Sequence, residues 1–396
     1  MILDVYLCGE KIGTLQSTPD RGIVFSYMPS ATRSLSLSLP ILGTEYPEKN
    51  CMPFFSGLLP DGDMKTRIAN QLHVSETSTF KLLTLLGGEC AGAVTLLEEG
   101  TQYPETQNQY EPLAVKDIET MIDDIAVRPL LTGRKGLRLS LAGAQQKLPL
   151  ALVDGKWQLP LQGSPSTHII KPDSKVSSNE YVCLKLAEAC GIPVPDAQLI
   201  HFGKHRTLVM ARYDRIWTDG KIERLHQEDL CQALAIAPER KYEEDGGPGY
   251  NRILPLLVRY SALPAMSVFQ VLTLMVFNYL IGNCDAHAKN FSLLYSHGAA
   301  SPVLAPAYDL VSTTLYPELS TDMAMSTNGE RRIDRLVRQD FLSIWDAPKL
   351  TDSIIKNLTS VFPKALSSLR KNLDDGECLS VLEQIERQSE PRLHRL

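Results

Sequence analysis

The sequence lacks the cysteine patterns of a metal-binding or disulfide-bonded protein. Its eight cysteines are scattered, no two of them form a C-x-x-C pair, and no Cys/His group has the spacing of a zinc site. Scattered cysteines of this kind are typical of small buried side chains in a reducing compartment, so we expect a cytoplasmic protein. The N-terminal stretch MILDVYLCGEKIG also lacks the basic start and the long apolar run of a signal peptide.

Long apolar segments and an excess of positive charge are absent as well. The most apolar stretch, SVFQVLTLMVFNYLIG, has 16 residues and contains Gln270 and Asn278. A membrane-spanning helix needs about 20 apolar residues, so we expect a buried core helix here. The net charge of −6 argues against nonspecific nucleic-acid binding by the whole surface, although a local basic patch is still compatible with it.

The 396 residues are enough for two or three domains with cores of their own, and neither an internal repeat nor a low-complexity tract is present. Strand-like alternation marks residues 3–15, 22–28 and 34–40, and a helix is expected within 74–88, with Ser75 as N-cap and Gly87 as its stop. The polar stretch 98–114, with two prolines, predicts a linker.

Beyond this linker the pattern changes from mixed to helical. Short strands are expected around 137–140, 148–153, 167–171, 197–202 and 206–213, with a helix at 179–190 closed by Gly191. From about 224 onward the pattern is mostly helical, with one strand-like pair at 291–296 and 302–310. We therefore expect an α+β fold in which a small mixed lobe precedes a large helical lobe, with a cleft between them.

The stretch NCDAHAKNFSLLY gathers polar residues between two apolar runs. Asp285 and Asn290 lie five positions apart on a loop after the expected core helix, and Asp309 follows 19 residues later, where we expect a strand to end. A carboxylate that deprotonates a hydroxyl, with an amide oxygen and a second carboxylate that bind Mg²⁺, is the set that phosphoryl transfer requires. The Asp-x-x-x-x-Asn spacing matches the kinase catalytic loop, but a turn with Asx caps explains it equally.

Two charged residues upstream fit the same chemistry. Lys171 ends the apolar strand of THIIKPD, where its ammonium group could hold ATP phosphates. Glu180 opens the next helix, where it could pair with Lys171. A water-facing lysine at a strand edge and a first-turn glutamate that complements the helix dipole are the alternatives.

Two further segments have residue patterns that are compatible with nucleotide binding. In RLSLAGAQQKLPLAL, the small residues at 142–144 let backbone N–H groups approach a phosphate, and Lys147 adds charge. The loop is neither a Walker A motif nor G-x-G-x-x-G, so an ordinary tight hairpin is the alternative. The stretch TLVMARYDR (207–215) predicts a strand that could offer hinge backbone groups to adenine, or a plain core strand.

The order of these elements is that of a protein kinase: small-residue loop, strand lysine, helix glutamate, hinge strand, Asp-x-x-x-x-Asn and a further Asp. We therefore predict a two-lobed protein-kinase-like α+β fold with an N-terminal α/β subdomain. The expected boundaries are 1–97 for that subdomain, 98–114 for the linker, 115–217 for the N-lobe and 218–396 for the helical C-lobe.

The sequence resembles the HipA-type serine/threonine kinase toxins of bacterial toxin–antitoxin modules over nearly the whole chain. PFFSGLLPDG and LLTLLGGECAGAV look like the N-terminal domain of that family. The kinase core is similar in LSLAGAQQKLPL, THIIKPD, NEYVCLKLAEACGIPVP, MARYDR, LHQEDLCQAL, GNCDAHAKNFSLLY and LAPAYDLVSTTLYP. LHQEDLCQAL is a hallmark without an evident chemical role, so we expect His226 and Glu228 to support packing or the site.

The resemblance implies a role for each matched residue. Asp285 corresponds to the catalytic base, with Lys289 and Asn290 beside it, and Asn290 and Asp309 correspond to the Mg²⁺ ligands. Glu180 is the possible partner of Lys171, the lysine that binds ATP phosphates. The remaining ATP-binding residues are Ala142, Gly143, Ala144, Gln145, Gln146 and Lys147 of the phosphate loop, Ala211, Arg212 and Tyr213 of the hinge, and His287 and Tyr308.

Ser140, just before the phosphate loop, corresponds to the serine that the family autophosphorylates, although a polar residue on a half-buried strand is the plain alternative. A phosphate there adds about −1.5 to −2 charges beside an anion-binding loop, which should expel the loop and stop ATP binding. The chain departs from the family at Ala211, where Glu is common, so backbone contacts to adenine must suffice. It also has Ala288 where Gly is frequent.

The resemblance implies an ATP- and Mg²⁺-dependent kinase that inhibits growth by phosphorylating a translation component such as an aminoacyl-tRNA synthetase. It also implies a small helix-turn-helix antitoxin as partner, through which the chain would reach operator DNA. The basic stretch at 330–339 could touch DNA directly or form a solvated helix face. The alternatives are a catalytically silent nucleotide-binding co-repressor and a metal hydrolase built on Asp285, His287 and Asp309.

Overall fold

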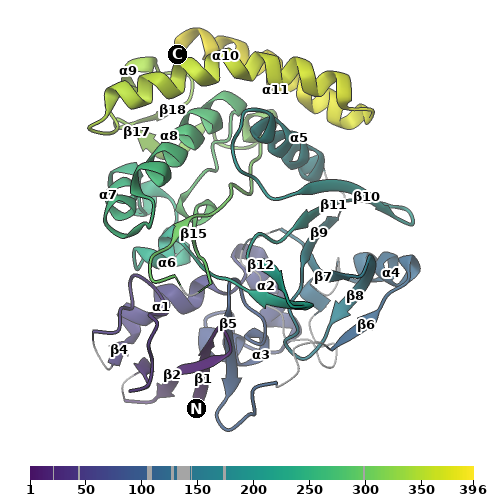
Figure 1. The fold of residues 1–396 in the computed structure, drawn as a ribbon, viewed down its shortest axis with the longest axis vertical. Coiled ribbons are helices and arrows are strands. Elements are labelled where there is room, and N and C mark those ends of the chain that lie inside the picture. The colour runs from purple at the N-terminus through teal and green to yellow at the C-terminus, as the bar shows by residue number, and fades with distance from the viewer. Residues whose placement is uncertain are drawn as a thin grey trace. The chain divides into compact units, whose positions relative to one another are not determined.

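Two units, each assembled from separate segments of the chain, make up the computed structural model (Figure 1). Unit 1 contains Met1–Pro172, Ile200–Glu239 and Leu294–Ala300, and unit 2 contains Asp173–Leu199, Arg240–Leu293 and Ser301–Leu396. The structure describes residues 1–20, 22–42, 45–104, 109–125, 129–131, 143, 145–172, 175–297 and 299–396.

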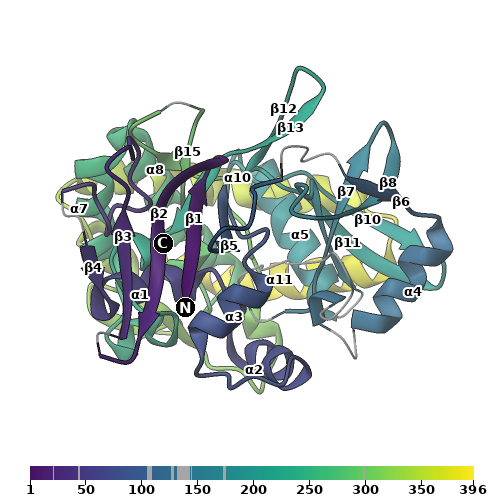
Figure 2. The same cartoon turned by 90° about the horizontal axis from the view of Figure 1, so that it is seen from below.

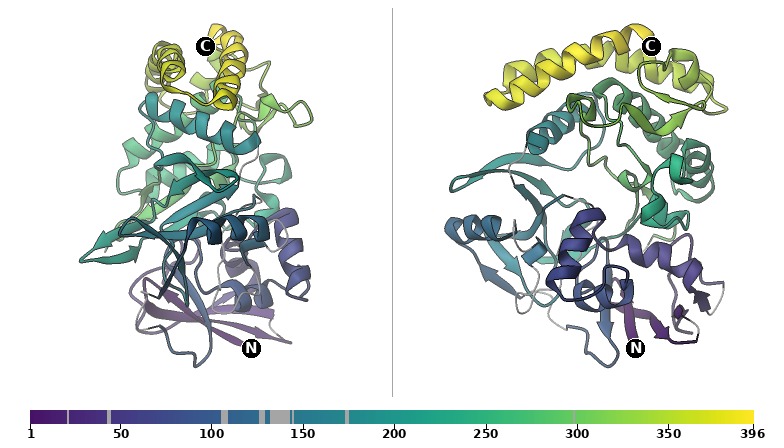
Figure 3. Two further views of the ribbon diagram at one scale, coloured as in Figure 1. Left: turned by 90° about the vertical axis from the view of Figure 1, so that its right-hand side faces the viewer. Right: turned by 180° about the vertical axis from the view of Figure 1, so that it is seen from behind.

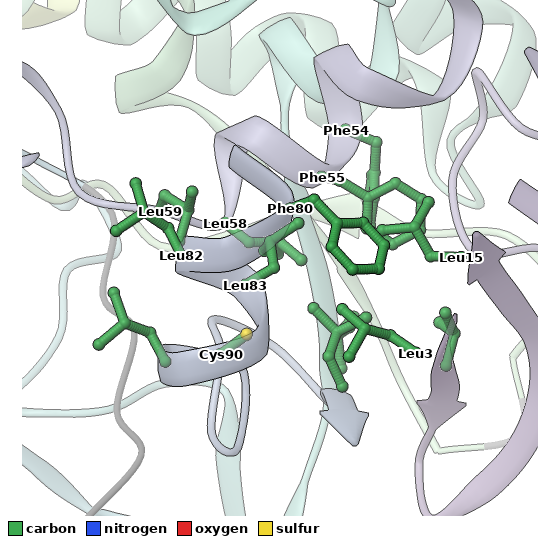
Figure 4. Packing of buried hydrophobic residues seen from close by; sticks show 14 of the residues in the cluster. Leu3, Leu15, Phe54, Phe55, Leu58, Leu59, Phe80, Leu82, Leu83 and Cys90 are labelled. Carbon is green, nitrogen blue, oxygen red and sulfur yellow. The ribbon is translucent and has the colours of Figure 1, made fainter. Parts of the chain in front are cut away.

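The N-terminal part of unit 1 is an antiparallel sheet covered by helices. In sheet order the strands are β4 (Glu45–Pro47), β3 (Gly22–Tyr27), β2 (Glu10–Thr18), β1 (Ile2–Leu7) and β5 (Val94–Glu98). Figure 2 shows β1, β2 and β3 side by side. The helices are α1 (Glu48–Gly57), α2 (Gly62–Gln71) and α3 (Thr79–Leu86). Strand and helix residues share one apolar core, which includes Leu3, Leu15, Phe54, Phe55, Phe80 and Leu83 (Figure 4).

Two local predictions in this region are wrong. Residues 34–40 do not form a regular strand, because the Tyr27 hydroxyl accepts the Leu35 N–H at 2.7 Å and donates to the Leu39 carbonyl at 2.5 Å. These bonds hold the segment as a turn with both leucines buried. Ser75 is not the N-cap of α3, whose N-cap is Ser78; the Ser75 hydroxyl instead accepts the Thr77 N–H. Gly87 does end the helix.

A second sheet follows, and part of the expected linker belongs to it. In sheet order its strands are β10 (Ala197–Phe202), β11 (His205–Ala211), β9 (His168–Pro172), β7 (Leu148–Val153), β8 (Lys156–Pro160) and β6 (Tyr110–Pro112). The expected strands at 148–153, 167–171, 197–202 and 206–213 are thus confirmed, and 137–140 lies outside the described residues. Tyr110–Pro112 was expected within the linker, but it pairs with β8 as an edge strand.

Helix α4 (Val115–Ile125) closes the core of this sheet. Its apolar face carries Ile118, Met121, Ile122 and Ile125, which are buried with Leu148, Ile170 and Phe202 of the strands. A short 3₁₀ turn, Pro129–Leu131, comes next in the described chain. The three- and four-residue spacing of the buried residues of α4 is typical of a helix that packs one face on a sheet.

A buried network of ion pairs lies directly after β11, where the chain leaves the second sheet. The Arg212 guanidinium pairs with Asp214 at 2.8 Å, and Arg215 pairs with both Asp214 and Glu89 at 2.9 Å. Burial alone would raise the pKa of Asp214, but the two guanidinium groups lower it below its usual range. Removing one partner from such a network strands a buried charge, which typically costs about 3–5 kcal/mol.

The hallmark LHQEDLCQAL begins as a strand, not as part of the helical region expected from 224. After the hairpin of β12 (Arg215–Thr218) and β13 (Lys221–Arg224) come β14 (His226–Asp229) and α6 (Leu230–Ala233). Glu228 accepts hydrogen bonds from the Ser36 hydroxyl, the Leu37 N–H and the Tyr295 hydroxyl. His226 bonds the Leu35 carbonyl through Nε2 at 2.9 Å. Both side chains therefore hold the turn at 34–40 in place.

Unit 2 is mostly helical. Its helices are α5 (Lys175–Ala189), α7 (Tyr250–Tyr260), α8 (Pro264–Ile281), α9 (Arg338–Leu342), α10 (Pro348–Asn372) and α11 (Gly376–Arg395). Helices α10 and α11 run side by side and both pack on α5 and α8 (Figure 3). Among the described helices, α8 is the one long and apolar enough to cross a membrane, yet 67% of it is buried in the protein. The expected core helix is confirmed.

Short elements complete unit 2. They are the strands β15 (Ser292–Tyr295), which continues into unit 1, β16 (Val303–Leu304), β17 (Asp322–Thr327) and β18 (Glu330–Arg332), and 3₁₀ turns at Glu243–Asp245, Ala288–Asn290 and Thr313–Leu315. A further 3₁₀ turn, Pro238–Arg240, begins in unit 1 and ends at the first residue of the next unit 2 segment. The basic stretch 330–339 is not the helix face considered above, because it begins with β18 and reaches only the start of α9. Arg331 pairs with Glu244 and Arg332 with Asp334, which neutralises part of its charge.

The Glu228 cluster predicts a dependence of stability on pH. Burial raises the pKa of Glu228 to about 7, although its three hydrogen bonds lower it part of the way. A carboxyl group whose pKa is raised by folding binds its proton more tightly in the folded state, so stability falls as pH rises from the unfolded pKa of about 4.3 to about 7. We expect Glu228→Gln to flatten this fall in urea unfolding between roughly pH 5 and pH 8.

The exposed Glu98 on β5 offers the matched control. Glu98→Gln should leave the pH dependence of the unfolding free energy as it is in the wild type. A wild-type curve that rises steadily with pH, and that Glu228→Gln does not alter, would show that Glu228 stays ionised in the fold.

Candidate active site

The end of α8 sets the geometry of the polar loop that follows it. Gly282 adopts a left-handed conformation with φ +75°, and the Asn283 N–H bonds the Asn278 carbonyl at 2.8 Å. The Asn283 side chain bonds Asn278 at 3.0 Å and accepts the Asp285 N–H at 3.2 Å. The turn is thus capped by Asn283, which leaves the Asp285 side chain available for another role.

The Asp285 carboxylate is held by a tyrosine from elsewhere in unit 2. The Tyr242 hydroxyl donates to Asp285 Oδ1 at 2.8 Å. Burial raises the pKa of Asp285 above its ordinary value, and nearby Asp309 raises it further, whereas Tyr242 and Lys241 lower it. A carboxyl group in this environment is a stronger base than an exposed aspartate, and this suits proton abstraction.

Asn290 and Asp309 lie next to this carboxylate. Asn290 ends a 3₁₀ turn, and its Nδ2 donates to the Asp285 backbone carbonyl at 3.2 Å, so its amide oxygen is directed elsewhere. The Tyr308 hydroxyl bonds the Lys289 carbonyl at 2.7 Å and Ser292 Oγ at 2.6 Å, which ties the Asp309 segment to the loop. Asp309 itself has φ +58° and lies beyond the end of β16, not at a strand end as expected.

His287 and Lys289 are both buried in the loop. The His287 ring packs edge-on against Tyr242, with centroids 5.3 Å apart. Burial, with a further contribution from Lys241, holds the pKa of His287 far below its usual range, so the imidazole is neutral. Its Nδ1 is buried without a hydrogen-bond partner among the described residues. The His287 ring therefore packs the loop against Tyr242.

The donor set fits a hard divalent cation shared with a phosphate. The donors are the carboxylate of Asp309, which is close enough to raise the pKa of Asp285, and the amide oxygen of Asn290. Oxygen donors of this kind suit Mg²⁺, which keeps few protein ligands and completes its shell with water and phosphate oxygens. Among the described residues, no group of three or more His, Cys, Asp or Glu side chains is placed to hold a metal ion.

Unit 1 carries the residues expected to bind phosphate. Lys171 lies on β9 opposite Leu208 of β11 and is buried. Gly143 has φ +104°, and a β-carbon there would lie 2.8 Å from the Lys147 Nζ, so the ammonium group covers this glycine. Gly143 also bridges to Pro60, in the PFFSGLLPDG motif. Lys147, Gln145 and Gln146 are half-buried, whereas Ser140, Ala142 and Ala144 lie outside the described residues.

The hinge residues offer their backbone more than their side chains. Ala211 is the last residue of β11 and pairs with His168. The Arg212 guanidinium is committed to the buried ion network, and the Tyr213 hydroxyl donates to Gln227 at 2.5 Å. Contact with a base at this point would therefore have to come from backbone groups.

Glu180 does not open a helix as expected. It is the sixth residue of α5, in the second turn, and it is fully buried, so first-turn dipole complementarity does not explain it. Lys171 belongs to unit 1 and Glu180 to unit 2, so their pairing stays a prediction.

Four residues that hold the loop in place were not predicted from the sequence: Asn179, Thr313, Thr314 and Arg392. Asn179 binds both backbone groups of Ser312. Thr313 Oγ1 accepts the Cys284 N–H at 2.8 Å, and Arg392 donates to the Leu280 carbonyl at 3.1 Å and to Thr314 Oγ1 at 3.0 Å. No local sequence pattern predicts these hydrogen bonds, because the bonded residues are far apart in the chain.

Comparison with known proteins identifies the family of this chain. The model of the HipA N-terminal domain matches residues 3–97, and that of the HipA-like C-terminal domain matches residues 139–366. The chain belongs to the HipA family. The serine/threonine-protein kinase toxin HipA of Shewanella oneidensis is 30% identical over 355 residues, 85% of this chain and 80% of that protein. A candidate kinase of Sinorhizobium fredii, Y4mE, is 42% identical over 340 residues, 82% of this chain and 80% of that protein.

A solved structure agrees with the family assignment. It is the Shewanella oneidensis MR-1 toxin–antitoxin complex of HipA, HipB and operator DNA, whose matching chain superimposes with a TM-score of 0.85 at 27% identity. The match covers 99% of this chain and 97% of that chain. The expected α+β kinase-like fold is confirmed.

Gly282 is the position at which this HipA-family loop is most sensitive to one added carbon. A β-carbon would meet Thr314 Oγ1 and the Arg392 guanidinium, and the left-handed backbone disfavours any L side chain. We expect Gly282→Ala to lower the free energy of unfolding by about 1–3 kcal/mol in urea titrations. Gly376→Ala, where a β-carbon meets open space at the start of α11, should be neutral or slightly stabilising. Equal losses in both variants would contradict this account of Gly282.

Proposed function

We propose that the chain is an ATP- and Mg²⁺-dependent serine/threonine protein kinase. The observation that carries the proposal is the buried Asp285 carboxylate, whose pKa is raised, near Asp309 and in a loop where the Asn290 side chain bonds the Asp285 backbone carbonyl. Kinase names among the relatives and the confirmed fold support it. Asp285 takes the proton of a serine or threonine hydroxyl as that oxygen attacks the terminal phosphorus of ATP, and the bond from this phosphorus to the β,γ-bridging oxygen breaks to release ADP.

The other residues position the nucleotide in this proposal. Asn290 and Asp309 hold Mg²⁺, which when bound neutralises charge on the phosphate oxygens. Lys171, Lys147 and the backbone of the loop at 142–147 bind phosphates, and backbone groups at 211–213 receive adenine. Lys289 and His287, buried beside the base, and Tyr308, which fastens the loop, complete the site.

The family relationship supports a proposal for the biological role. The Shewanella relative was solved with HipB and operator DNA. We propose that this chain is likewise a growth-inhibiting toxin in the cytoplasm, that it pairs with a helix-turn-helix antitoxin, and that it reaches operator DNA through that partner. A translation component such as an aminoacyl-tRNA synthetase is the proposed substrate, and autophosphorylation of Ser140 is the proposed off-switch. A silent nucleotide-binding co-repressor is the alternative, and phosphate transfer by the wild-type protein would exclude it.

Asp285→Asn tests the proposed base. The amide cannot accept the hydroxyl proton, so phosphate transfer from labelled ATP, including transfer to Ser140, should fall by about 10²- to 10⁴-fold. Nucleotide binding, measured by calorimetry, should persist. Asp374→Asn changes an exposed carboxylate of the same unit and should keep wild-type activity. Full activity of Asp285→Asn would reject Asp285 as the base, and a wild-type protein that binds ATP without transferring phosphate would favour the co-repressor.

A further inference from the structure

Tyr242 is the side chain that most directly controls the Asp285 carboxylate. Its hydroxyl donates to Oδ1 at 2.8 Å, which leaves Oδ2 as the carboxylate oxygen for an incoming hydroxyl. Its ring packs on the neutral His287, and the Lys241 ammonium lies 5.2 Å from the ring centroid. The tyrosine thus contacts the proposed base and its loop at once, although it comes from a segment 43 residues earlier.

The segment that carries Tyr242 is anchored at several points. The Ser326 N–H and hydroxyl both donate to Glu243, the hydroxyl at 2.8 Å, and Arg331 pairs with Glu244 at 2.7 Å. The Gly247 N–H donates to the Tyr242 carbonyl at 2.8 Å. These bonds connect the residues beside Tyr242 to β17 and β18. They hold the segment 240–247, called the platform below, in one position and with it the Tyr242 side chain.

The glycines of KYEEDGGPG are required by this platform. Gly246 has φ +83°, and a β-carbon at Gly247 would lie 2.4–2.6 Å from the carbonyl oxygens of Arg240 and Tyr242. Any other residue at these positions would force the turn open and withdraw the tyrosine. The local sequence is therefore suited to holding one side chain against the loop.

We infer that Tyr242 is a positioning residue that fixes the Asp285 carboxylate so that its second oxygen meets the acceptor hydroxyl. This inference rests on the proposed kinase function. A carboxylate free to rotate about its side-chain bonds spends only part of its time in a productive geometry, whereas a hydrogen bond to one oxygen selects one orientation. The orienting third member of a catalytic triad acts in the same way.

Tyr242→Phe tests the inference, because it keeps the ring on His287 and removes only the hydroxyl. We expect kcat to fall by about tenfold with unchanged KM for ATP, since geometry at the base is lost and nucleotide contacts are not. Tyr260→Phe, a tyrosine in α7 of the same unit, should match the wild type. A rise in activity would instead mean that the phenol blocks the acceptor position, and an unchanged kcat would also overturn the inference.

A double-mutant cycle separates positioning from a structural role. If Tyr242 acts through Asp285, Tyr242→Phe should cost nothing further in an Asp285→Asn background, whereas independent losses would multiply. A crystal structure of Tyr242→Phe gives a readout that needs no activity: the Asp285 carboxylate should turn from its wild-type orientation or occupy several. An unchanged, singly occupied carboxylate would contradict the inference, whereas an inactive wild type with a displaced Asp285 in the variant would contradict only the proposed kinase function.

Discussion

The left-handed turn at Gly282 is the constraint on which the loop depends. Helix α8 must end there, because its next residues turn back toward Thr313 and Thr314, and the space of a side chain at Gly282 is filled by Thr314 and Arg392. The Thr314 N–H donates to the Gly282 carbonyl at 3.1 Å, and Thr313 receives the Cys284 N–H. The position of Asp285 is therefore set by hydrogen bonds of backbone groups three residues and one residue before it.

The C-terminal helix takes part in this constraint. Arg392 of α11 is buried and donates to the last-turn carbonyl of Leu280 in α8, where a cation complements the negative end of the helix. Gln388, one turn earlier, bonds both the hydroxyl and the carbonyl of Thr314. The match to the HipA-like C-terminal domain model ends at residue 366, so the chain beyond that match helps to hold the loop.

Sequence periodicity predicted the elements whose form is set locally. The strands at 148–153 and 197–202 have the expected bounds, and the core helix before Asp285 was found from its apolar run. The strand prediction failed at 34–40, where distant polar groups decide the structure, and Glu180 was misplaced because α5 begins at Lys175, before the expected start. The site shows the same difference between local and distant features. The Asp-x-x-x-x-Asn spacing could be recognised in the sequence. The contacts of Tyr242, Arg392 and Asn179 could not, because these residues lie 43, 112 and 133 positions from their partners.

The motif alone also leaves the basicity of Asp285 undetermined. Burial and Asp309 raise its pKa, while Tyr242 and Lys241 lower it, and none of these influences belongs to the loop's own six residues. A general base works best when its pKa is neither so low that it accepts no proton nor so high that it is already protonated. The same phenol that orients the carboxylate also restrains its pKa. The segment that carries Tyr242 therefore affects both the geometry and the basicity of Asp285, although it lies outside the Asp-x-x-x-x-Asn motif.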